Sequence, residues 1–138
     1  MRQVLIWVLL VLPAAGVVNG LWFSAELKRF LEAVPVLASS HHMQQYKRLV
    51  ARQMYAALVQ LVILALPPVV FLAGLVMGVL RLPDVLFVII PSTVVLVVAL
   101  SMRPTELKAR SIPTADPELE RERDQVVATW LKKPLPDW

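Results

Sequence analysis

Three long stretches of this chain contain no charged side chain: Gln3–Ala25, Gln53–Leu80 and Val85–Met102. All 24 charged residues lie outside them. A helix of about 17–25 apolar residues crosses the hydrocarbon core of a bilayer, so each stretch is long enough to span it. In lipid, backbone groups must form hydrogen bonds within their own segment, which favours helices for such runs. The sequence therefore predicts an all-α integral membrane protein with three transmembrane helices.

The basic residues are divided unequally between the two sides of these spans. Lys and Arg are enriched in cytoplasmic segments, and this bias sets the orientation of a membrane protein. Only Arg2 and Arg81 lie on one side, against twelve on the other. We expect the N-terminus outside and the C-terminus in the cytoplasm, in a bacterial inner membrane or an intracytoplasmic or thylakoid membrane. The twelve are Lys28, Arg29, Lys47, Arg48, Arg52, Arg103, Lys108, Arg110, Arg121, Arg123, Lys132 and Lys133.

The three-span region is predicted to cover residues 1–102. Its second and third spans are joined only by Arg81–Asp84, which favours a tight turn and an antiparallel helical hairpin. Apolar residues continue at helical spacing beyond the first span until Pro35, and a second helix is predicted to begin at Ser39 or Ser40. Residues 26–52 are therefore expected to form a cytoplasmic helical elbow.

Residues 103–138 form a polar, proline-rich tail. Asp116 suits the N-cap of a helix and Pro117 suits its first position, so we predict a short amphipathic helix at about 117–132 with extended chain around it. A tail of this composition is usually disordered alone, so we expect a partner protein to hold it by apolar anchors. The predicted anchors are Leu119, Val126, Trp130 and Trp138.

All four glycines fall into two steps of the small-xxx-small type, one late in the first span and one late in the second. This spacing flattens a helix face and lets another backbone approach closely. The two spans run in opposite directions, so the two steps lie at different depths and cannot pack together. We expect each step to contact the third span or another subunit. The predicted helix-packing residues are Gly16, Asn19, Gly20, Gly74 and Gly78.

Asn19 is a strong polar group near the middle of the first span, and Gln60, Ser92 and Thr93 are other polar side chains within the spans. They suit either hydrogen bonding between helices or the lining of a pathway. No ionisable residue accompanies them, although proton and ion routes normally place one in the membrane. We therefore favour hydrogen bonding between helices.

The two histidines, His41 and His42, are adjacent and are followed by Met43. Neighbouring residues on a helix point about 100° apart, so the pair does not suit a shared metal, which prefers a spacing of three or four. The chain also has no cysteine, which excludes disulfides and iron–sulfur ligation. We predict no metal and no cofactor.

The basic cluster Lys47, Arg48 and Arg52 lies just before the second span. Basic residues at this level attract anionic lipid headgroups, each adding about 1 kcal/mol. The cluster is therefore predicted to contact lipid headgroups, in addition to fixing the orientation of the chain. The basic residues are too scattered to indicate nucleic-acid binding.

The leading hypothesis is a non-catalytic accessory or structural subunit of a larger membrane complex, with respiratory and photosynthetic assemblies as the first candidates. Other membrane subunits would be its partners. The alternative is a homo-oligomeric small channel or transporter whose pore forms between copies. A membrane enzyme is disfavoured because the spans contain no pairing of a nucleophile with a base.

Overall fold

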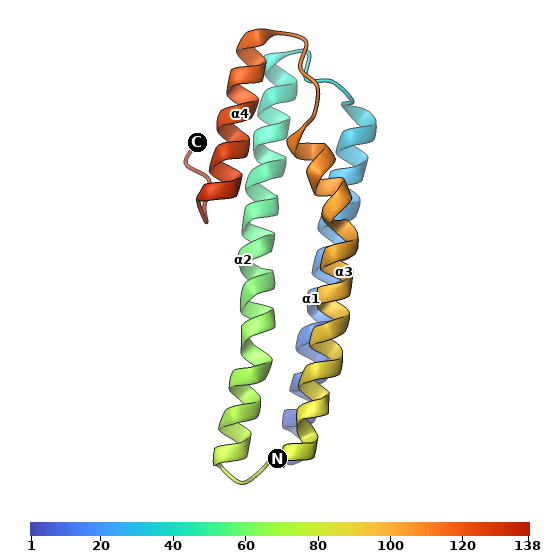
Figure 1. The fold of residues 1–138 in the computed structure, drawn as a ribbon, viewed down its shortest axis with the longest axis vertical. Coiled ribbons are helices and arrows are strands. Elements are labelled where there is room, and N and C mark those ends of the chain that lie inside the picture. Colours follow the sequence, from blue (N-terminus) through green and yellow to red (C-terminus); the bar gives the residue numbers. More distant parts are fainter. The chain divides into compact units, whose positions relative to one another are not determined.

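The computed structural model describes all 138 residues, and its order of elements is entirely helical. Helix α1 spans Arg2–Ala33, α2 Ser40–Val76, α3 Leu86–Arg110 and α4 Pro117–Lys132, with a short 3-10 helix, η1, at Leu82–Val85 (Figure 1). Helices hold 83% of the residues and there is no strand. α1, α2 and the η1–α3 segment are long and apolar enough to cross a membrane. The predicted all-helical class and the three apolar helices are therefore confirmed.

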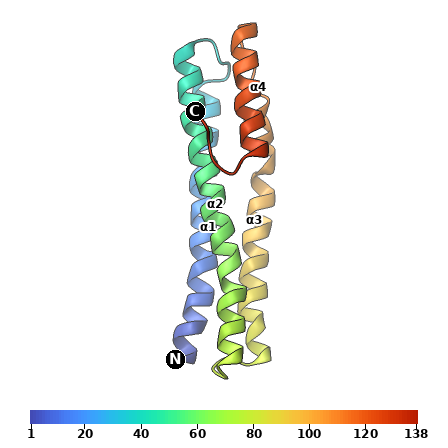
Figure 2. The same ribbon diagram turned by 90° about the vertical axis from the view of Figure 1, so that its left-hand side faces the viewer.

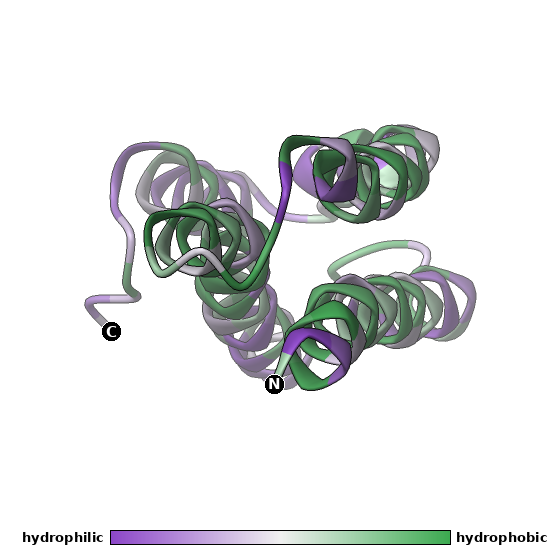
Figure 3. Ribbon diagram, turned by 90° about the horizontal axis from the view of Figure 1, so that it is seen from below, coloured by the Kyte–Doolittle hydropathy of each residue, from purple (hydrophilic) through white to green (hydrophobic).

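The chain divides into two compact units, and each long helix contributes to both. We call Met1–Leu21 with Val59–Ser101 the span unit, and Trp22–Leu58 with Met102–Trp138 the charged unit. The charged unit holds 21 of the 24 charged residues. In the span unit the hydrophobic colour of Figure 3 predominates and is not confined to one side of the helices. Such a surface suits contact with lipid or with other apolar helices.

The span unit has a small buried core. α3 contributes to the interior along a narrow seam. Val88 and Val95 are buried there, and the hydroxyl of Ser92, which lies between them in sequence, is enclosed as well. This spacing of four and then three residues is that of a single helix face. Most other large side chains of the α3 span are exposed. The core cluster comprises Leu9, Phe71, Leu80 and Val88.

An ion pair ties the start of α1 to the turn between α2 and α3. The Arg2 guanidinium donates two hydrogen bonds to the Asp84 carboxylate, at 2.8 and 3.3 Å, and the Arg81 backbone N–H donates another at 2.9 Å. Asp84 is buried, whereas the Arg2 side chain is half exposed.

In the charged unit, α4 runs alongside the first part of α2, as Figures 1 and 2 both show. Val126 of α4 is only 2% exposed and belongs to the same core as Tyr46 and Val50 of α2. Leu119 and Trp130 pack against this core, and the Arg110 guanidinium lies 5.2 Å from the centre of the Trp130 ring. The apolar face of α4 is therefore covered by the chain itself.

Two connecting segments of the charged unit are joined through their backbones. The Leu37 N–H donates to the Pro113 carbonyl at 2.9 Å, and the Ala115 N–H donates to the Leu37 carbonyl at 3.1 Å. These bonds form an isolated parallel bridge between Leu37 and Thr114. Buried backbone groups need such partners, so the bridge lets Leu37 be fully enclosed outside a helix.

Tyr46 connects α2 to the end of α3. Its side chain is fully buried, and its hydroxyl donates a 2.8 Å hydrogen bond to the Ala109 carbonyl. The last carbonyls of a helix have no partner within the helix, so this bond satisfies an acceptor that would otherwise be buried and unpaired. Burial raises the pKa of Tyr46, because the phenolate would lose its hydration. The hydroxyl therefore keeps its proton at all ordinary pH values.

One expectation about the tail is wrong. α3 does not end near Met102 but continues to Arg110, so residues 103–110 are helical and not extended. Packing explains the extension, because Ala109 is fully buried with Leu27 and Leu49. Val126 and its neighbours are enclosed by the chain's own residues, and docking of the tail to a partner protein stays a prediction.

We expect Tyr46→Phe to destabilise the charged unit by about 1–3 kcal/mol, because the Ala109 carbonyl would remain buried without its donor. Thermal unfolding of the full chain in mild detergent would measure the loss. Tyr55→Phe is the matched control, since Tyr55 is 54% exposed. An equal effect of both substitutions would show that the buried Tyr46 hydrogen bond contributes no more to stability than the exposed Tyr55 hydroxyl does.

Candidate functional site

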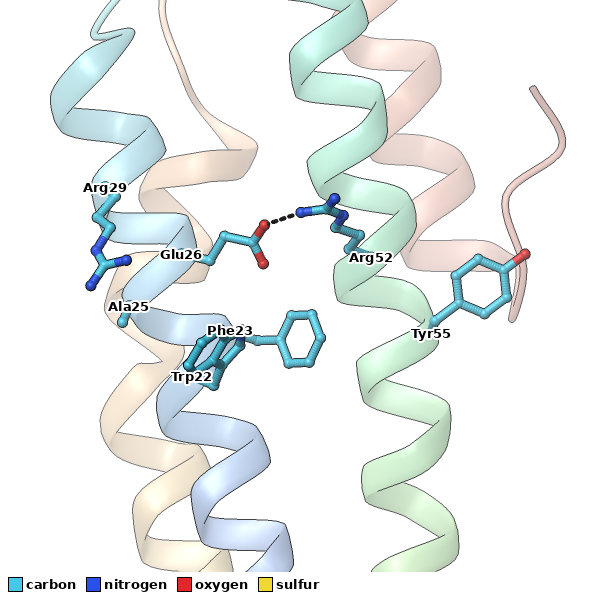
Figure 4. A pocket seen from close by; sticks show the side chains of 7 residues that line it. All are labelled: Trp22, Phe23, Ala25, Glu26, Arg29, Arg52 and Tyr55. Carbon is cyan, nitrogen blue, oxygen red and sulfur yellow. Dashed lines mark hydrogen bonds and ion pairs between the residues drawn. The ribbon is translucent and has the colours of Figure 1, made fainter.

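A pocket of about 530 Å³ lies within the charged unit, on the side where α1 and α2 face each other. Figure 4 shows the side chains that line it. Five come from α1 and two from α2, and they combine aromatic rings with charged groups. The lining residues are Trp22, Phe23, Ala25, Glu26, Arg29, Arg52 and Tyr55.

Helical spacing places these residues together. Trp22, Ala25, Glu26 and Arg29 are separated by three, one and three residues, which puts them on one face of α1. Arg52 and its neighbour Tyr55, three residues later on α2, share a face in the same way. The pocket is therefore a product of two regular helices and needs no special loop.

Two polar contacts join the helices at the pocket. The Glu26 carboxylate accepts a 2.5 Å hydrogen bond from the Arg52 guanidinium, and the dashed line in Figure 4 marks it. The Gln53 amide donates a 2.8 Å hydrogen bond to the Phe23 carbonyl. The Arg52 side chain remains 67% exposed. This exposure makes the ion pair a weak contributor to stability but leaves the guanidinium open to a ligand.

The lining groups suit binding better than catalysis. Two guanidinium groups supply hydrogen-bond donors of fixed geometry, and the aromatic rings supply apolar surface. The one carboxylate is already paired with Arg52, and no Ser, Cys or His side chain lines the pocket. The arrangement therefore matches an anionic, partly apolar ligand.

The histidines lie elsewhere and make local contacts. The His41 ring is 3.2 Å from the Gln45 amide, and the His42 ring accepts a 3.4 Å hydrogen bond from the Ala38 N–H. No group of three or more His, Cys, Asp or Glu residues is placed to hold a metal ion.

The three residues predicted to contact lipid headgroups have different surroundings. Lys47 pairs with Glu122 of α4 at 2.5 Å, so its charge is partly balanced within the charged unit. Arg48 is exposed and forms no ion pair. Arg52 alone lines the pocket. Headgroup contact remains a prediction for all three.

The glycines have neighbours that the sequence did not indicate. A Cβ atom at Gly16 would lie 2.9 Å from an Ile63 methyl carbon of α2, and one at Gly74 would lie 2.6 Å from Leu80 and 3.3 Å from Leu5 of α1. The expectation that each motif contacts the third span or another subunit is therefore wrong for these two. Each glycine faces large side chains of the opposite helix or of the following turn. Such packing does not require a second glycine at the same depth.

Gly78 has a different structural role. Its φ angle is +70°, and no atom lies within 4 Å of the position where a Cβ would be built. The left-handed conformation there lets the Val79 and Leu80 N–H groups return to the Gly74 carbonyl at 2.9 and 3.0 Å, just after α2 ends. Gly78 therefore terminates α2 instead of packing against a helix.

The polar groups of the spans make hydrogen bonds within the span unit. The Asn19 amide donates to the Gln60 carbonyl oxygen at 3.1 Å, which joins α1 to α2. Thr93 donates to the Ile89 carbonyl of its own helix. Ser92 is the exception, since its enclosed hydroxyl has no hydrogen-bond partner.

The predicted partner anchors divide into two groups. Leu119, Val126 and Trp130 are packed in the core of the charged unit, so they do not offer a free apolar surface. The reason is that an amphipathic helix is covered by the nearest apolar surface, here α2. Trp138 remains 44% exposed, and Leu131 and Leu135 are also exposed nearby in sequence.

The sequence interpretation did not identify Glu26, Arg29 or Asp84 as interacting residues. The spacing of Trp22, Glu26 and Arg29 was a usable signal for the pocket face. Nothing local indicated that Asp84 would pair with Arg2, because 82 positions separate them.

Comparison of the chain with known protein families, curated proteins and solved structures finds no match.

We expect Gly74→Leu to destabilise the span unit by about 1–3 kcal/mol, because the added side chain would overlap Leu80 and Leu5. Ala73→Leu is the matched control, since Ala73 is exposed on the same turn of α2. The melting temperature of the detergent-solubilised chain measures both. The packing assigned to Gly74 is incorrect if both variants melt like the unaltered protein.

Proposed function

We propose that this chain is a non-catalytic accessory or structural subunit of a larger multi-subunit membrane complex. The supporting observation is the exposure of α3. Few residues are buried in the most apolar 18-residue window of any span: 11% in the η1–α3 segment and 17% in α1 and in α2, a difference of one residue. Burial in α3 is concentrated in the seam at Val88, Ser92 and Val95.

Association of helices in a membrane depends on close packing and hydrogen bonds, because lipid tails are as apolar as the helices themselves. A narrow seam supplies few such contacts. Apolar helices of another subunit would add packing along the exposed side chains of α3, including Ile90, Val94 and Val97. In this proposal the chain is held in the complex mainly through α3.

The tail has a smaller part in this proposal than its sequence indicated. Val126 and its neighbours are used inside the charged unit, so docking would involve the exposed Leu131, Leu135 and Trp138. The proposal keeps the N-terminus outside and the C-terminus in the cytoplasm, in agreement with the charge bias. A respiratory or photosynthetic complex remains the first class of assembly to test.

The alternative, a homo-oligomeric channel, gains no support from the contacts. Its pore would need Asn19, Gln60, Ser92 and Thr93 on a shared polar surface, and the Ser92 hydroxyl is enclosed. Asn19 and Gln60 are hydrogen-bonded to each other, and Thr93 to its own helix. The subunit proposal is therefore preferred.

Gentle detergent extraction followed by native electrophoresis and mass spectrometry tests the proposal. We expect the chain to migrate with other membrane proteins at a fixed stoichiometry. Migration as a monomer, or only as copies of itself, would contradict the proposal, and the second result would favour the channel.

Single tryptophan substitutions test the proposed role of α3. We expect Val94→Trp and Val97→Trp to lower the fraction of chain in the complex about tenfold or more, which corresponds to about 1.4 kcal/mol of lost packing. Val62→Trp and Val69→Trp on the exposed surface of α2 are matched controls. Equal behaviour of the two pairs would remove the special role assigned to α3.

A further inference from the structure

The pocket in the charged unit lies where both of its helices change from charged to uncharged sequence. Glu26 is the first charged residue after the uncharged stretch of α1, and Arg52 is the last before that of α2. The ion pair between them therefore marks the same boundary on two helices. In a protein that crosses a bilayer, this boundary corresponds to the level of the lipid headgroups.

Aromatic residues at the pocket agree with this level. Trp22 is 69% exposed and Tyr55 is also exposed, although both are large aromatic side chains. Trp and Tyr are enriched where lipid tails meet headgroups, because each combines an apolar ring with a polar group. The exposed rings therefore suit an environment that is partly lipid and partly water.

The charges of the lining favour an anion. Arg29 forms no ion pair, and Arg52 is held by Glu26 but remains largely exposed. The two guanidinium groups and the single carboxylate give the lining a net charge of +1. Figure 4 shows Arg29 on α1 and Arg52 on α2, with Glu26 extending from α1 toward Arg52. A guanidinium group binds phosphate oxygens through two parallel hydrogen bonds.

We propose that this pocket binds the headgroup of an anionic phospholipid, with Arg52 as the phosphate ligand, Arg29 supplying a second positive charge, and Trp22 and Phe23 beside the acyl chains. A phosphodiester complements the +1 lining, and the apolar groups on the same surface distinguish a lipid from a free anion. The volume of about 530 Å³ is within the usual range for a ligand site. This inference does not depend on the subunit proposal, because it concerns only residues of one chain.

Glu26 has a defined part in this proposal. It orients Arg52 across the pocket, and it also lowers the attraction of the site for an anion by one charge. Glu26 therefore sets a moderate affinity, and removing its charge should tighten lipid binding. A purely structural ion pair would not give this result.

The test is a titration of the full chain in non-ionic detergent with short-chain phosphatidylglycerol, followed by the rise in melting temperature. We expect Arg29→Gln to weaken the apparent affinity about fivefold, which is the effect of one basic residue at a membrane surface. We expect Glu26→Gln to tighten it by a similar factor. Arg29 makes no ion pair, so its substitution does not endanger folding. Lys28→Gln is the matched control, since Lys28 is exposed, lies outside the pocket and does not belong to the predicted headgroup cluster.

Four results would overturn the proposal. An equal loss in Lys28→Gln would indicate a general basic surface. Equal stabilisation by phosphatidylcholine of the same chain length would show that the pocket does not distinguish an anionic headgroup from a zwitterionic one. Stabilisation by inorganic phosphate at the same concentration would indicate a site for soluble anions. A Glu26→Gln variant that melts lower without binding lipid more tightly would leave the ion pair with a structural role only.

Discussion

Hydrogen bonding of the backbone within each apolar run is the constraint on which the rest of this structure depends. A chain in lipid cannot leave its N–H and C=O groups unpaired, so the three uncharged stretches have to be helical. Helices formed in this way do not stop where the apolar residues stop. α1 continues to Ala33, α2 begins at Ser40 and α3 continues to Arg110, and each extension carries charged residues on a regular helix. The charged unit is largely built from these extensions, and the pocket residues are positioned by the same helical repeat.

The fold class could be predicted because it depends on local sequence. Eighteen or more residues without a charge indicate a spanning helix whatever surrounds them. The end of α3 could not be predicted in this way. The sequence predicts extended chain from Arg103 to the next helix, but α3 passes through Pro104, and Ala109 is buried with Leu27 and Leu49. The position where a helix ends is decided here by contacts with residues far away in the sequence.

The same limit applies to the candidate site and the apolar faces. The sequence showed that α4 has an apolar face containing Val126 and Trp130, but not which surface covers it, and α2 covers it. It showed that Gly16 and Gly74 are positions of close approach, but the neighbours are Ile63, Leu80 and Leu5. The pairing of Glu26 with Arg52 depends on how two helices are rotated about their axes, which a pattern along one helix does not contain. Residue type and spacing indicate whether a helix face is apolar, charged or suited to close packing. Tertiary packing decides which surface that face contacts.

The contacts that hold α3 explain why its exposed surface matters. Without a hydrophobic driving force in lipid, the Val88, Ser92 and Val95 seam supplies limited packing, and the Ser92 hydroxyl has no partner. The stronger connections are at the two ends of the helix, at Asp84 before it and at Ala109 in its last turn. A helix held by contacts at both ends can leave a long apolar surface exposed to other membrane helices and still be held in the fold. In the proposed accessory subunit, this division of roles, with polar contacts at the ends and apolar exposure between them, would leave α3 available to other membrane helices.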